Sequence, residues 1–582
     1  MFVLLTLGCK SNSPIAIKSD PGVFSRYQHS LDVAGEDFGG DVEDWVKDAQ
    51  PRSSLTEIPD EFWDLSLEES LLIALNDTKI LRSLNANVLF NPQAAPSNLD
   101  PAVTSSDPIV GTEAALAQFD ANVAASLIYS NNDDVFNNPI LSGGAAEVQQ
   151  DLTVGSFNIN KTAATGTRFD IQSNVTHDNT NNTTVFFGSS FTTLWQASVR
   201  QPLLQGRGVR FNQIAGPNGT VGLRFGTGIL IRRINHDISI VQFERSVQQM
   251  VNEIINAYWT LELAYRNFDS IKQTRDGSLK TWNIAKARRD NGLVGGEADR
   301  ESQAREQYYL FQAQLLAALN GDPQNGISGI LQAESDLRRL LNLPQSDQAL
   351  IRPADQPIMG QTVRPWHDLA DLAMTYRTEI REQRQRVNQR KLEYEAALNF
   401  TLPRLDAIAT YRNNGFGDDL INGGGGQFVG AVDNAIDGDY DEWEVGFTLD
   451  VPVGLRQAHA GLRNTQLQLS REKALLKEQQ RQVLHDLGGA VRQVDQNRAN
   501  IELAKLRSEA AVETVEARFA AYEADAIGFD ELLDAQSRML TAQLAYFNAI
   551  TNYELSRNDL YLQSGRLLIE HGVALNECDS CF

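Results

Sequence analysis

Four segments of the chain alternate apolar and polar residues with a period of two, which is the pattern of a β-strand. In the first, Val123, Ala125 and Leu127 share one face, whereas Asn122 and Ser126 share the other. The four segments lie at 119–129, 194–201, 404–412 and 443–451. Each has about the 9–11 residues that a tilted strand needs to cross a bilayer. This pattern predicts four strands, in either a membrane β-barrel or a soluble β-sandwich, because both alternate in the same way.

Aromatic residues stand near the ends of these segments, as they do in the interfacial girdle of a membrane barrel. They are Tyr129, Trp195, Tyr411 and Trp443. Four strands are too few to close a barrel, for which eight is the usual minimum. If the strands cross a membrane, several chains must therefore share one barrel.

Two long segments repeat apolar residues every seven positions, which is typical of helices packed as coiled coils. The seams of the first are Ile240, Val247, Ile254 and Leu261, and Phe243, Met250, Ala257 and Ala264. Those of the second are Leu469, Leu476, Val483 and Ala490, and Leu487, Val494 and Ile501. Residues 228–292 would form a helix of about 95 Å at 1.5 Å per residue. Such a helix is much longer than those of ordinary globular domains.

The chain reads as two copies of one pattern: a helix, a β-hairpin, a long helix, a turn and a returning helix. The opening helices are expected at 65–89 and 366–398, the turns near Gly292 and Asp525, and the returning helices at 297–319 and 529–568. The first hairpin is 36 residues longer than the second. Its ends, Phe119 and Pro202, are 83 positions apart in the sequence, whereas Leu405 and Pro452 are 47 positions apart. We expect this insertion to project as a polar outer loop, although residues 153–175 alternate and offer further strands as the other interpretation.

The N-terminal residues MFVLLTLGC end in a small residue followed by Cys9, which resembles the end of a bacterial lipoprotein signal. We therefore expect Cys9 to carry lipid; the alternative is an export signal with an incidental cysteine. Near the other end, Cys578 and Cys581 form a C-x-x-C pair. Two ligands do not make a closed zinc site, so this pair is either a terminal disulfide or part of a polar tail.

The composition excludes several classes of protein. The chain of 582 residues has 51 basic and 75 acidic residues, for a net charge of −24, which disfavours binding to nucleic acid. After the first positions, no run of 18 apolar residues occurs, which excludes a bundle of transmembrane helices. There is no Walker A motif, no G-x-S-x-G and no pair of histidines at metal-ligand spacing. We therefore predict no enzymatic activity, no cofactor and no metal site.

Four local motifs, in the right order within this duplication, resemble the TolC-type outer-membrane efflux proteins. They are SVRQPLLQGRG at 198–208, LPRLDAIATY at 402–411, WEVGFTLDVPVGLRQAHA at 443–460 and FDELLDAQSRMLTAQLAYFNAITNYELSRNDLYLQSG at 529–565. The resemblance covers roughly residues 65–575. It implies a mainly α protein with a membrane β-barrel and a long periplasmic coiled-coil α-barrel. Each of three chains would contribute four strands to a shared 12-stranded barrel.

The resemblance also implies a function and partners. Such a protein is a passive exit duct of the bacterial outer membrane. Its homotrimer docks a periplasmic adaptor, and through it an inner-membrane transporter, in a tripartite efflux or secretion system. The alternative interpretation is a lipoprotein scaffold that bridges envelope layers through coiled coils without conducting. A pore needs the polar strand face to meet water, whereas a sealed scaffold does not.

The resemblance assigns roles to residues at the helical tips. Glu531 and Asp534 match the family's acidic positions at the periplasmic gate, and their i, i+3 spacing puts them on one helix face. Three copies would give a ring of six carboxylates, a form used for cation selectivity; the alternative is a solvated acidic face. The segments expected to meet the adaptor contain Gly292, Leu293, Val294 and Gly295, and Ala526, Ile527 and Gly528. Asp525 replaces the glycine that is usual at the second turn.

These expectations divide the chain into five parts. Residues 1–9 are a lipoprotein signal remnant, 10–64 an extended segment, 65–350 the first efflux repeat, 351–575 the second repeat, and 576–582 a tail.

Overall fold

The computed structural model describes most of the chain beyond its N-terminal segment. The described residues are 58, 61–76, 79–84, 91–135, 137, 144, 146–217, 219, 227–292, 297–322, 324, 328–345, 349–358, 364–421, 428, 430–438, 440–524 and 526–575. Cys9, Cys578 and Cys581 lie outside these residues, so the predictions made for them stay predictions.

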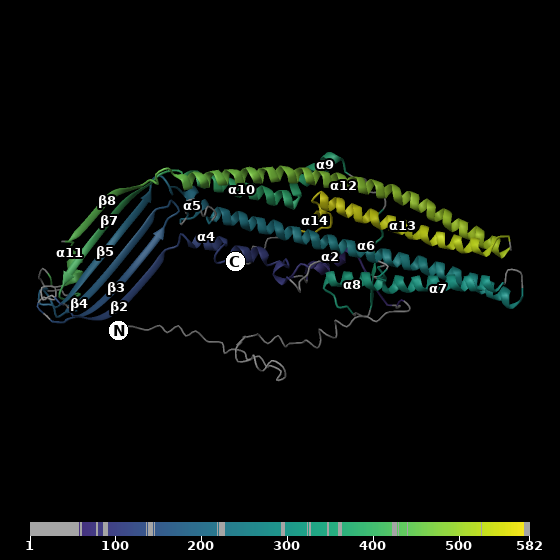
Figure 1. The fold of residues 1–582 in the computed structure, drawn as a ribbon, viewed down its shortest axis with the longest axis horizontal. Helices are drawn as coiled ribbons and strands as arrows, with labels where there is room; N and C mark the ends of the chain where they lie inside the picture. The colour runs from purple at the N-terminus through teal and green to yellow at the C-terminus, as the bar shows by residue number, and fades with distance from the viewer. Residues whose placement is uncertain are drawn as a thin grey trace, which may run out of the picture. The chain divides into compact units, whose positions relative to one another are not determined.

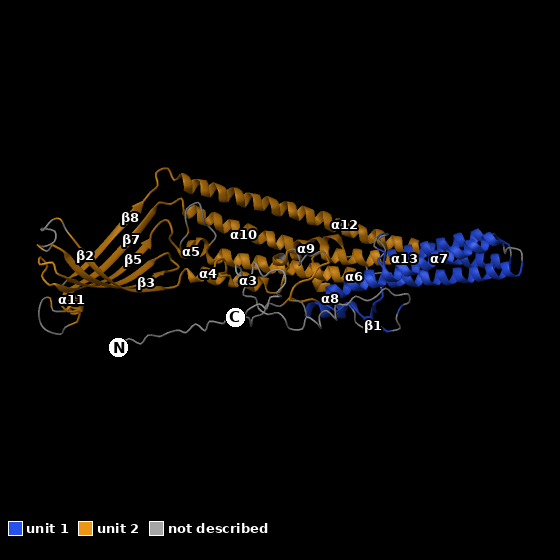
Figure 2. Cartoon of the chain, turned by 60° about the horizontal axis from the view of Figure 1, so that its bottom comes forward, with its two compact units in different colours: residues 1–76, 257–356, 505–548 blue, residues 77–256, 357–504, 549–582 orange. Residues whose placement is uncertain are grey.

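The chain divides into two compact units, each assembled from segments far apart in sequence (Figure 2). Unit 1 comprises residues 1–76, 257–356 and 505–548. Unit 2 comprises residues 77–256, 357–504 and 549–582. The long helices α6 (Ile229–Asp290), α12 (Arg456–Glu523) and α13 (Phe529–Gln563) each supply residues to both units.

Unit 2 contains a six-stranded antiparallel sheet whose strands follow one another in chain order (Figure 1). The strands are β2 (Asn122–Asp134), β3 (Val148–Thr162), β4 (Arg168–Thr180), β5 (Ser189–Pro202), β7 (Arg404–Gly417) and β8 (Asp441–Asp450). Among the described residues, β2 and β8 are therefore the two unpaired edges of this sheet.

The expectation of four strands per chain is wrong, and so is the outer loop expected of the insertion. The additional residues form strands β3 and β4, as the second interpretation of the alternating segment 153–175 proposed. Their alternation is weak in sequence because Gly155 and Ser173 occupy positions in the apolar rows. Pairing with β2 and β5 along their whole length supplies the hydrogen bonds that stabilise them. The first strand also begins at Asn122 rather than at Phe119, because helix α4 (Thr112–Ala117) and a turn precede it.

The register of the strands gives the sheet one apolar and one polar face. Leu127 lies opposite Gly155, Phe157 opposite Ser173, and so on across the sheet. The apolar face has rings and aliphatic chains on all six strands: Val123, Leu127, Tyr129, Phe157, Ile159, Phe169, Ile171, Trp195, Val199, Tyr411, Trp443, Val445, Phe447 and Leu449. Most of these side chains are exposed in the single chain, such as Trp443 at 75% and Phe447 at 71%.

A small helix, α11 (Ala431–Asp437), covers the sheet near the end of β7. Its first residue accepts a hydrogen bond of 3.0 Å from the Thr193 hydroxyl through the Ala431 carbonyl oxygen. A Cβ on Gly415 would come within 1.9 Å of the same oxygen. Glycine is therefore required where β7 passes under α11.

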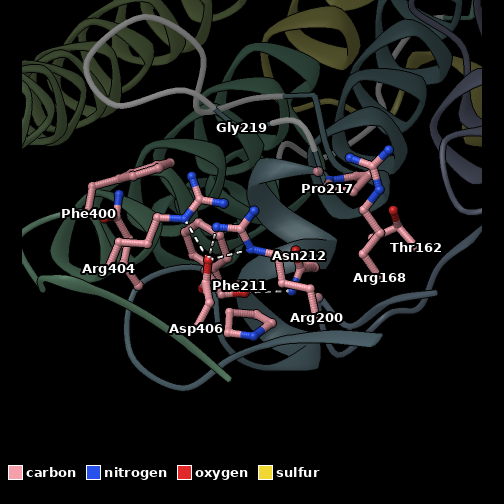
Figure 3. A pocket seen from close by; sticks show the side chains of 15 residues that line it. Thr162, Arg168, Arg200, Phe211, Asn212, Pro217, Gly219, Phe400, Arg404 and Asp406 are labelled. Carbon is pink, nitrogen blue, oxygen red and sulfur yellow. Dashed lines mark hydrogen bonds and ion pairs between the residues drawn. The ribbon is translucent and has the colours of Figure 1, made fainter. Parts of the chain in front are cut away.

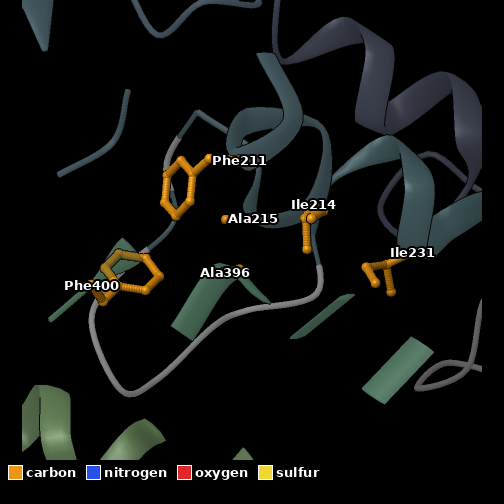
Figure 4. Packing of buried hydrophobic residues seen from close by; sticks show 6 residues of the cluster. All are labelled: Phe211, Ile214, Ala215, Ile231, Ala396 and Phe400. Carbon is orange, nitrogen blue, oxygen red and sulfur yellow. The ribbon is translucent and has the colours of Figure 1, made fainter. Parts of the chain in front are cut away.

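The sheet is joined to the helices of unit 2 through a small hydrophobic cluster (Figure 4). Helix α5 (Val209–Ala215) follows β5, and helix α10 (Thr378–Asn399) precedes β7. Their buried residues pack with the start of α6; the cluster is Phe211, Ile214, Ala215, Ile231, Ala396 and Phe400. The rings of Phe211 and Phe400 meet edge to face, with centroids 5.2 Å apart. The cluster holds the ends of β5 and β7 against two helices.

The remaining elements of unit 2 are short. They are η1 (Pro92–Ala94), α3 (Asp100–Ser106), α9 (Trp366–Tyr376) and α14 (Leu567–Glu570). The single helix expected at 366–398 is divided at Arg377, which has an extended conformation and separates α9 from α10.

Unit 1 combines parts of the long helices with α7 (Ala298–Asn320), α8 (Ile330–Leu341), α2 (Leu67–Asn76) and a two-stranded parallel sheet. That sheet pairs β1 (Phe62–Leu65) with β6 (Leu350–Pro353). A buried ion pair, 2.8 Å between Arg338 and Glu334, stabilises its edge, since Glu334 also accepts the N–H of Ile351. The opening helix expected at 65–89 ends at Asn76, and residues 85–90 lie outside the described part of the chain.

The long helices agree with the heptad pattern of the sequence. In α6, Val247, Ile254 and Leu261 are buried, as are Met250 and Ala264 of the second seam. In α12, the later seam residues are buried (Val483, Leu487, Ala490, Val494 and Ile501). The earlier ones, Leu469 and Leu476, are only half-buried. A seven-residue repeat therefore identified the buried side of each helix, more completely for α6.

Candidate functional site

The polar face of the sheet has side-chain hydrogen bonds between neighbouring strands at several places. The Ser126 and Ser156 hydroxyls are 2.7 Å apart across β2 and β3. The Asn158 amide donates to Asp170 at 3.2 Å across β3 and β4. The Arg412 guanidinium of β7 donates to the Gln196 amide oxygen of β5 at 2.8 Å. Many polar side chains on this face are partly exposed, as a surface in contact with water requires.

A cavity of about 310 Å³ lies at the end of this face, where the sheet meets α5 and α10 (Figure 3). Arg200 of β5 and Arg404 of β7 converge on the Asp406 carboxylate, whereas Arg168 of β4 lies apart from them. The distances to Asp406 are 2.7 Å from Arg200 and 3.0 Å from Arg404. Asp406 is 2% exposed, while both arginines are about half exposed.

The charges lining this cavity do not balance. Among the described residues that line it, Arg168, Arg200 and Arg404 contribute three guanidiniums and Asp406 contributes one carboxylate, an excess of two positive charges. The backbone beside it is constrained by Gly166, whose φ is +88°. A Cβ there would lie 2.7 Å from the Gly206 carbonyl oxygen. The turn between β3 and β4 is therefore packed against the residues that follow β5.

A second candidate region is the helical tip of unit 1, where α6 turns into α7 and α12 turns into α13. A cluster of buried side chains from all four helices stabilises it: Ala285, Ala304, Tyr522, Phe529 and Leu532. The Arg288 guanidinium stacks over the Tyr522 ring at 4.8 Å and donates to the Tyr522 carbonyl oxygen at 3.3 Å. The two turns thus belong to one packed tip.

The two acids predicted for the gate both lie at this tip, on the first turns of α13. Each forms an ion pair with an arginine. Glu531 pairs with Arg518 of α12, and Asp534 pairs with Arg538 one turn further along α13. All four side chains are at least partly exposed. The sequence located the acids on one helix face, but the basic partners reduce the negative charge that they present.

A third acid at the tip, Glu301 of α7, was not singled out from the sequence. Its carboxylate accepts from the Trp282 indole N–H at 2.9 Å and from Arg289 at 2.7 Å. The bond from Trp282, together with the charges of Arg305 and Arg289, lowers the pKa of Glu301 below its ordinary value. Its side chain is buried, at 4% exposure. No local motif distinguishes this residue, because its partners lie 12 and 19 residues earlier on another helix.

The segments predicted to meet an adaptor are only partly described. Gly292 lies in the turn after α6 with a φ of +65°, which explains glycine at this position. Ile527 packs against the buried cluster of the tip, between Ala526 and Gly528. Leu293, Val294 and Gly295 lie outside the described residues, as does Asp525. Glu297 directly precedes α7 and Asp299 lies in its first turn, and Glu297 pairs with Arg300 at 2.9 Å.

None of the helices in the described part of the chain has the unbroken apolar length that a transmembrane helix needs. No group of three or more His, Cys, Asp or Glu side chains in the described ranges is placed to hold a metal ion.

No family model matches the chain, and no curated relative does. Solved structures do match it over most of its length. The outer membrane protein VceC of Vibrio cholerae is 14% identical with a TM-score of 0.54, covering 86% of this chain and 96% of its own. The Campylobacter jejuni CmeC outer membrane channel is 13% identical with a TM-score of 0.55, covering 90% and 91%.

The open state of the Neisseria gonorrhoeae MtrE outer membrane channel is similar to the same degree. It is 15% identical with a TM-score of 0.54, and the match covers 89% of this chain and 95% of that one. At such identities the likeness concerns the fold. The resemblance to TolC-type proteins found in the sequence is thereby confirmed: this chain, mainly helical with a six-stranded sheet, has the fold of the outer-membrane channels.

Proposed function

We propose that this chain forms a passive, trimeric exit duct in the bacterial outer membrane. The observation that carries the proposal is the sheet with two unlike faces. One face is apolar on all six strands and exposed, as contact with lipid requires, whereas the other is polar and suited to a water-filled lumen. The fold shared with outer-membrane channels supports the same function.

Association of several copies is supported by apolar surface that the single chain leaves uncovered. Leucines along α12 are exposed: Leu467, Leu475, Leu503 and Leu506. In a helix with a heptad repeat, such residues are expected to pack against a neighbouring helix. Three copies would place α6, α7, α12 and α13 in one periplasmic tunnel. A barrel shared by the copies would then remove the edges of the sheet.

The tip of unit 1 is the part that we expect to meet other proteins of a tripartite system. A periplasmic adaptor would contact the turns containing Gly292 and residues 526–528, and would link the duct to an inner-membrane transporter. Glu531 and Asp534 would line the gate. At the other end of the sequence, lipid on Cys9 would hold the segment 10–64 at the inner leaflet of the outer membrane.

Conductance of the assembled protein tests this proposal. The purified full-length protein is first weighed by native mass spectrometry in detergent and then inserted into a planar bilayer. We expect a trimer with stable, ohmic single-channel conductance. Trimers that insert and never conduct would favour the alternative, an envelope-bridging scaffold. Monomers alone would contradict both the duct and its shared barrel.

A further inference from the structure

The strands β3 and β4, which the sequence offered only as the alternative to an outer loop, end level with the neighbouring strands and present their side chains to the same two faces of the sheet. Asn160 at the end of β3 pairs with Asn122 at the start of β2, and Arg168 of β4 pairs with Arg200 of β5. The other ends also coincide, since Asn179 lies opposite Ser189. The inserted hairpin therefore extends over the full height of the sheet rather than beyond its rim.

The apolar surface is continuous through this hairpin. Phe157, Phe169 and Ile171 are on inner strands of the sheet and yet are about half exposed on the apolar face. Ile171 lies in the row that connects Val123 of β2 with Ala197 of β5. Phe157 and Phe169 lie in the two neighbouring rows, which end at Trp195 and Val199 of β5. If the apolar face meets lipid, then β3 and β4 meet the same lipid, because no step in register separates them from their neighbours.

Both edge strands are unprotected. β2 has 13 residues and β8 has 10, and neither contains a lysine or a proline to prevent pairing. Almost every residue of both strands is exposed, in contrast to the inner strands. A long apolar edge with unpaired N–H and C=O groups is a strong site for pairing with another strand. Within a membrane it must be paired.

The two edges match each other. The strands alternate in direction, so an even number of them leaves β2 and β8 antiparallel. Val123, Ala125 and Leu127 of β2 lie on the same face of the sheet as Val445, Phe447 and Leu449 of β8. Edge β8 of one copy can therefore pair with β2 of a second copy and keep the apolar face continuous. One copy cannot pair with itself, since six strands are fewer than the usual minimum of eight.

From these observations, and resting on the proposed trimeric duct, we infer that β3 and β4 are part of the barrel wall and that three copies enclose eighteen strands rather than twelve. Each β8 pairs with the β2 of the next copy. With about 4.8 Å between strands and a tilt of about 40°, eighteen strands give a backbone diameter of about 36 Å, against about 24 Å for twelve. The lumen at the outer membrane would then be as wide as that of the largest porins, which are open aqueous channels.

Disulfide cross-linking between copies tests the pairing of the edges. In a chain with Cys578→Ser and Cys581→Ser, Thr448→Cys in β8 is combined in turn with cysteine at Asn122, Ala124, Ser126 or Ile128 in β2. These four positions share the polar face and cover the possible registers. Within one chain the two edges are about five strand spacings, or roughly 24 Å, apart, so any bond must join two copies.

We expect one or two of the four combinations to give covalent dimers and trimers on mild oxidation, with no larger species. The matched control combines Thr448→Cys with Thr176→Cys in the inner strand β4 and should give no cross-link. The background chain without new cysteines shows whether Cys9 contributes. A top view of the trimer by electron cryomicroscopy then counts the strands directly, and we expect eighteen.

The possible failures can be told apart. A trimer that conducts but shows no β2–β8 cross-link, or that has twelve strands with the hairpin outside the wall, would overturn this inference and leave the duct intact. Cross-linking that ends at a dimer would mean that two copies close twelve strands, which would overturn both this inference and the trimer.

Discussion

Arg518 on α12 forms an ion pair with Glu531 on α13, across the turn that joins the two helices. The second acid predicted for the gate, Asp534, pairs with Arg538. If these acids line a narrow opening in a trimer, the opening contains six carboxylates and six guanidiniums. Its selectivity then depends on how completely each arginine neutralises its acid, and not on the acids alone.

This arrangement predicts opposite effects for the two halves of the pair. Arg518→Gln leaves the Glu531 carboxylate without its partner, so cation preference and block by polyvalent cations should increase several-fold in single-channel recordings. Glu531→Gln combined with Asp534→Asn should decrease both. Screening limits each effect to a distance of about 8–10 Å, so the recordings should be made at low salt.

The control for these gate variants is Arg481→Gln, since Arg481 pairs with Glu478 at 3.3 Å on an exposed part of α12 in unit 2. It removes the same charge without touching the tip. Equal changes in selectivity for Arg481→Gln and Arg518→Gln would show that the pair at the turn does not line the narrow part of the pore.

The sequence predicted the long helices well because their signal is local. α6 runs from Ile229 to Asp290, close to the expected 228–292, since a seven-residue seam such as Val247, Ile254 and Leu261 repeats over many turns. Strands β7 and β8 were also recognised, because their alternation is strict. Strands β3 and β4 have glycine, serine and asparagine among the residues of both faces, so their alternation is weak. Their stability depends on pairing with neighbouring strands, and a short window of sequence does not show that pairing.

The same reason separates the acids of the tip that were predicted from the one that was missed. Glu531 and Asp534 stand in a recognisable motif three residues apart. Glu301 is distinguished only by Trp282 and Arg289, which reach it from the neighbouring helix. Contacts between helices depend on their packing, so a linear motif contains no sign of them.

Asp406 offers a test of the polar face. Asp406→Asn removes the carboxylate that accepts from Arg200 and Arg404, and the two guanidiniums then repel each other. We expect a loss of about 1–3 kcal/mol in the free energy of unfolding, the usual effect of losing hydrogen bonds to charged groups. In addition, ion selectivity should move towards anions, because the cavity gains one positive charge per chain.

These two effects of Asp406→Asn are measured by the urea midpoint of the β-sheet signal in circular dichroism and by reversal potentials. Asp450→Asn is the control, since Asp450 is an exposed residue of β8 on the same face. A reversal potential that is unaltered by Asp406→Asn would show that this cavity does not face the conducting path.

Glu301 predicts a pH dependence of the tip. Its pKa is lowered in the folded protein, so the unfolded chain takes up a proton at a higher pH than the folded one does. The stabilisation is therefore complete above the ordinary pKa of about 4.3. It is lost as the pH falls from there through the lowered value. Glu301→Gln should reduce stability at pH 7 and flatten the fall below pH 5.

Unfolding in guanidinium chloride between pH 3 and 7, followed by the helical signal in circular dichroism, measures this dependence. The control is Glu297→Gln, which removes an exposed carboxylate four residues earlier, just before α7 begins. If Glu301→Gln kept the full acid-dependent loss of the parent protein, another group would be responsible for it.

The exposed leucines of α12 give the last prediction, which concerns assembly. Leu503 is 67% exposed in the single chain, and Leu467 is similarly uncovered. Exposed positions tolerate substitution with little change in the stability of the monomer. If another copy covers these leucines, each Leu→Ser change removes about 1–2 kcal/mol of apolar burial from every interface that it joins.

The double variant Leu467→Ser and Leu503→Ser should therefore raise the concentration at which trimers dissociate by tenfold or more. Analytical ultracentrifugation in detergent measures that concentration, with Gln466→Ser, a substitution at an adjacent exposed position, as the control. Trimers that resist dilution as well as those of the parent protein would mean that this side of α12 faces water in the assembly, and that the copies associate through the sheet edges and the other helices instead.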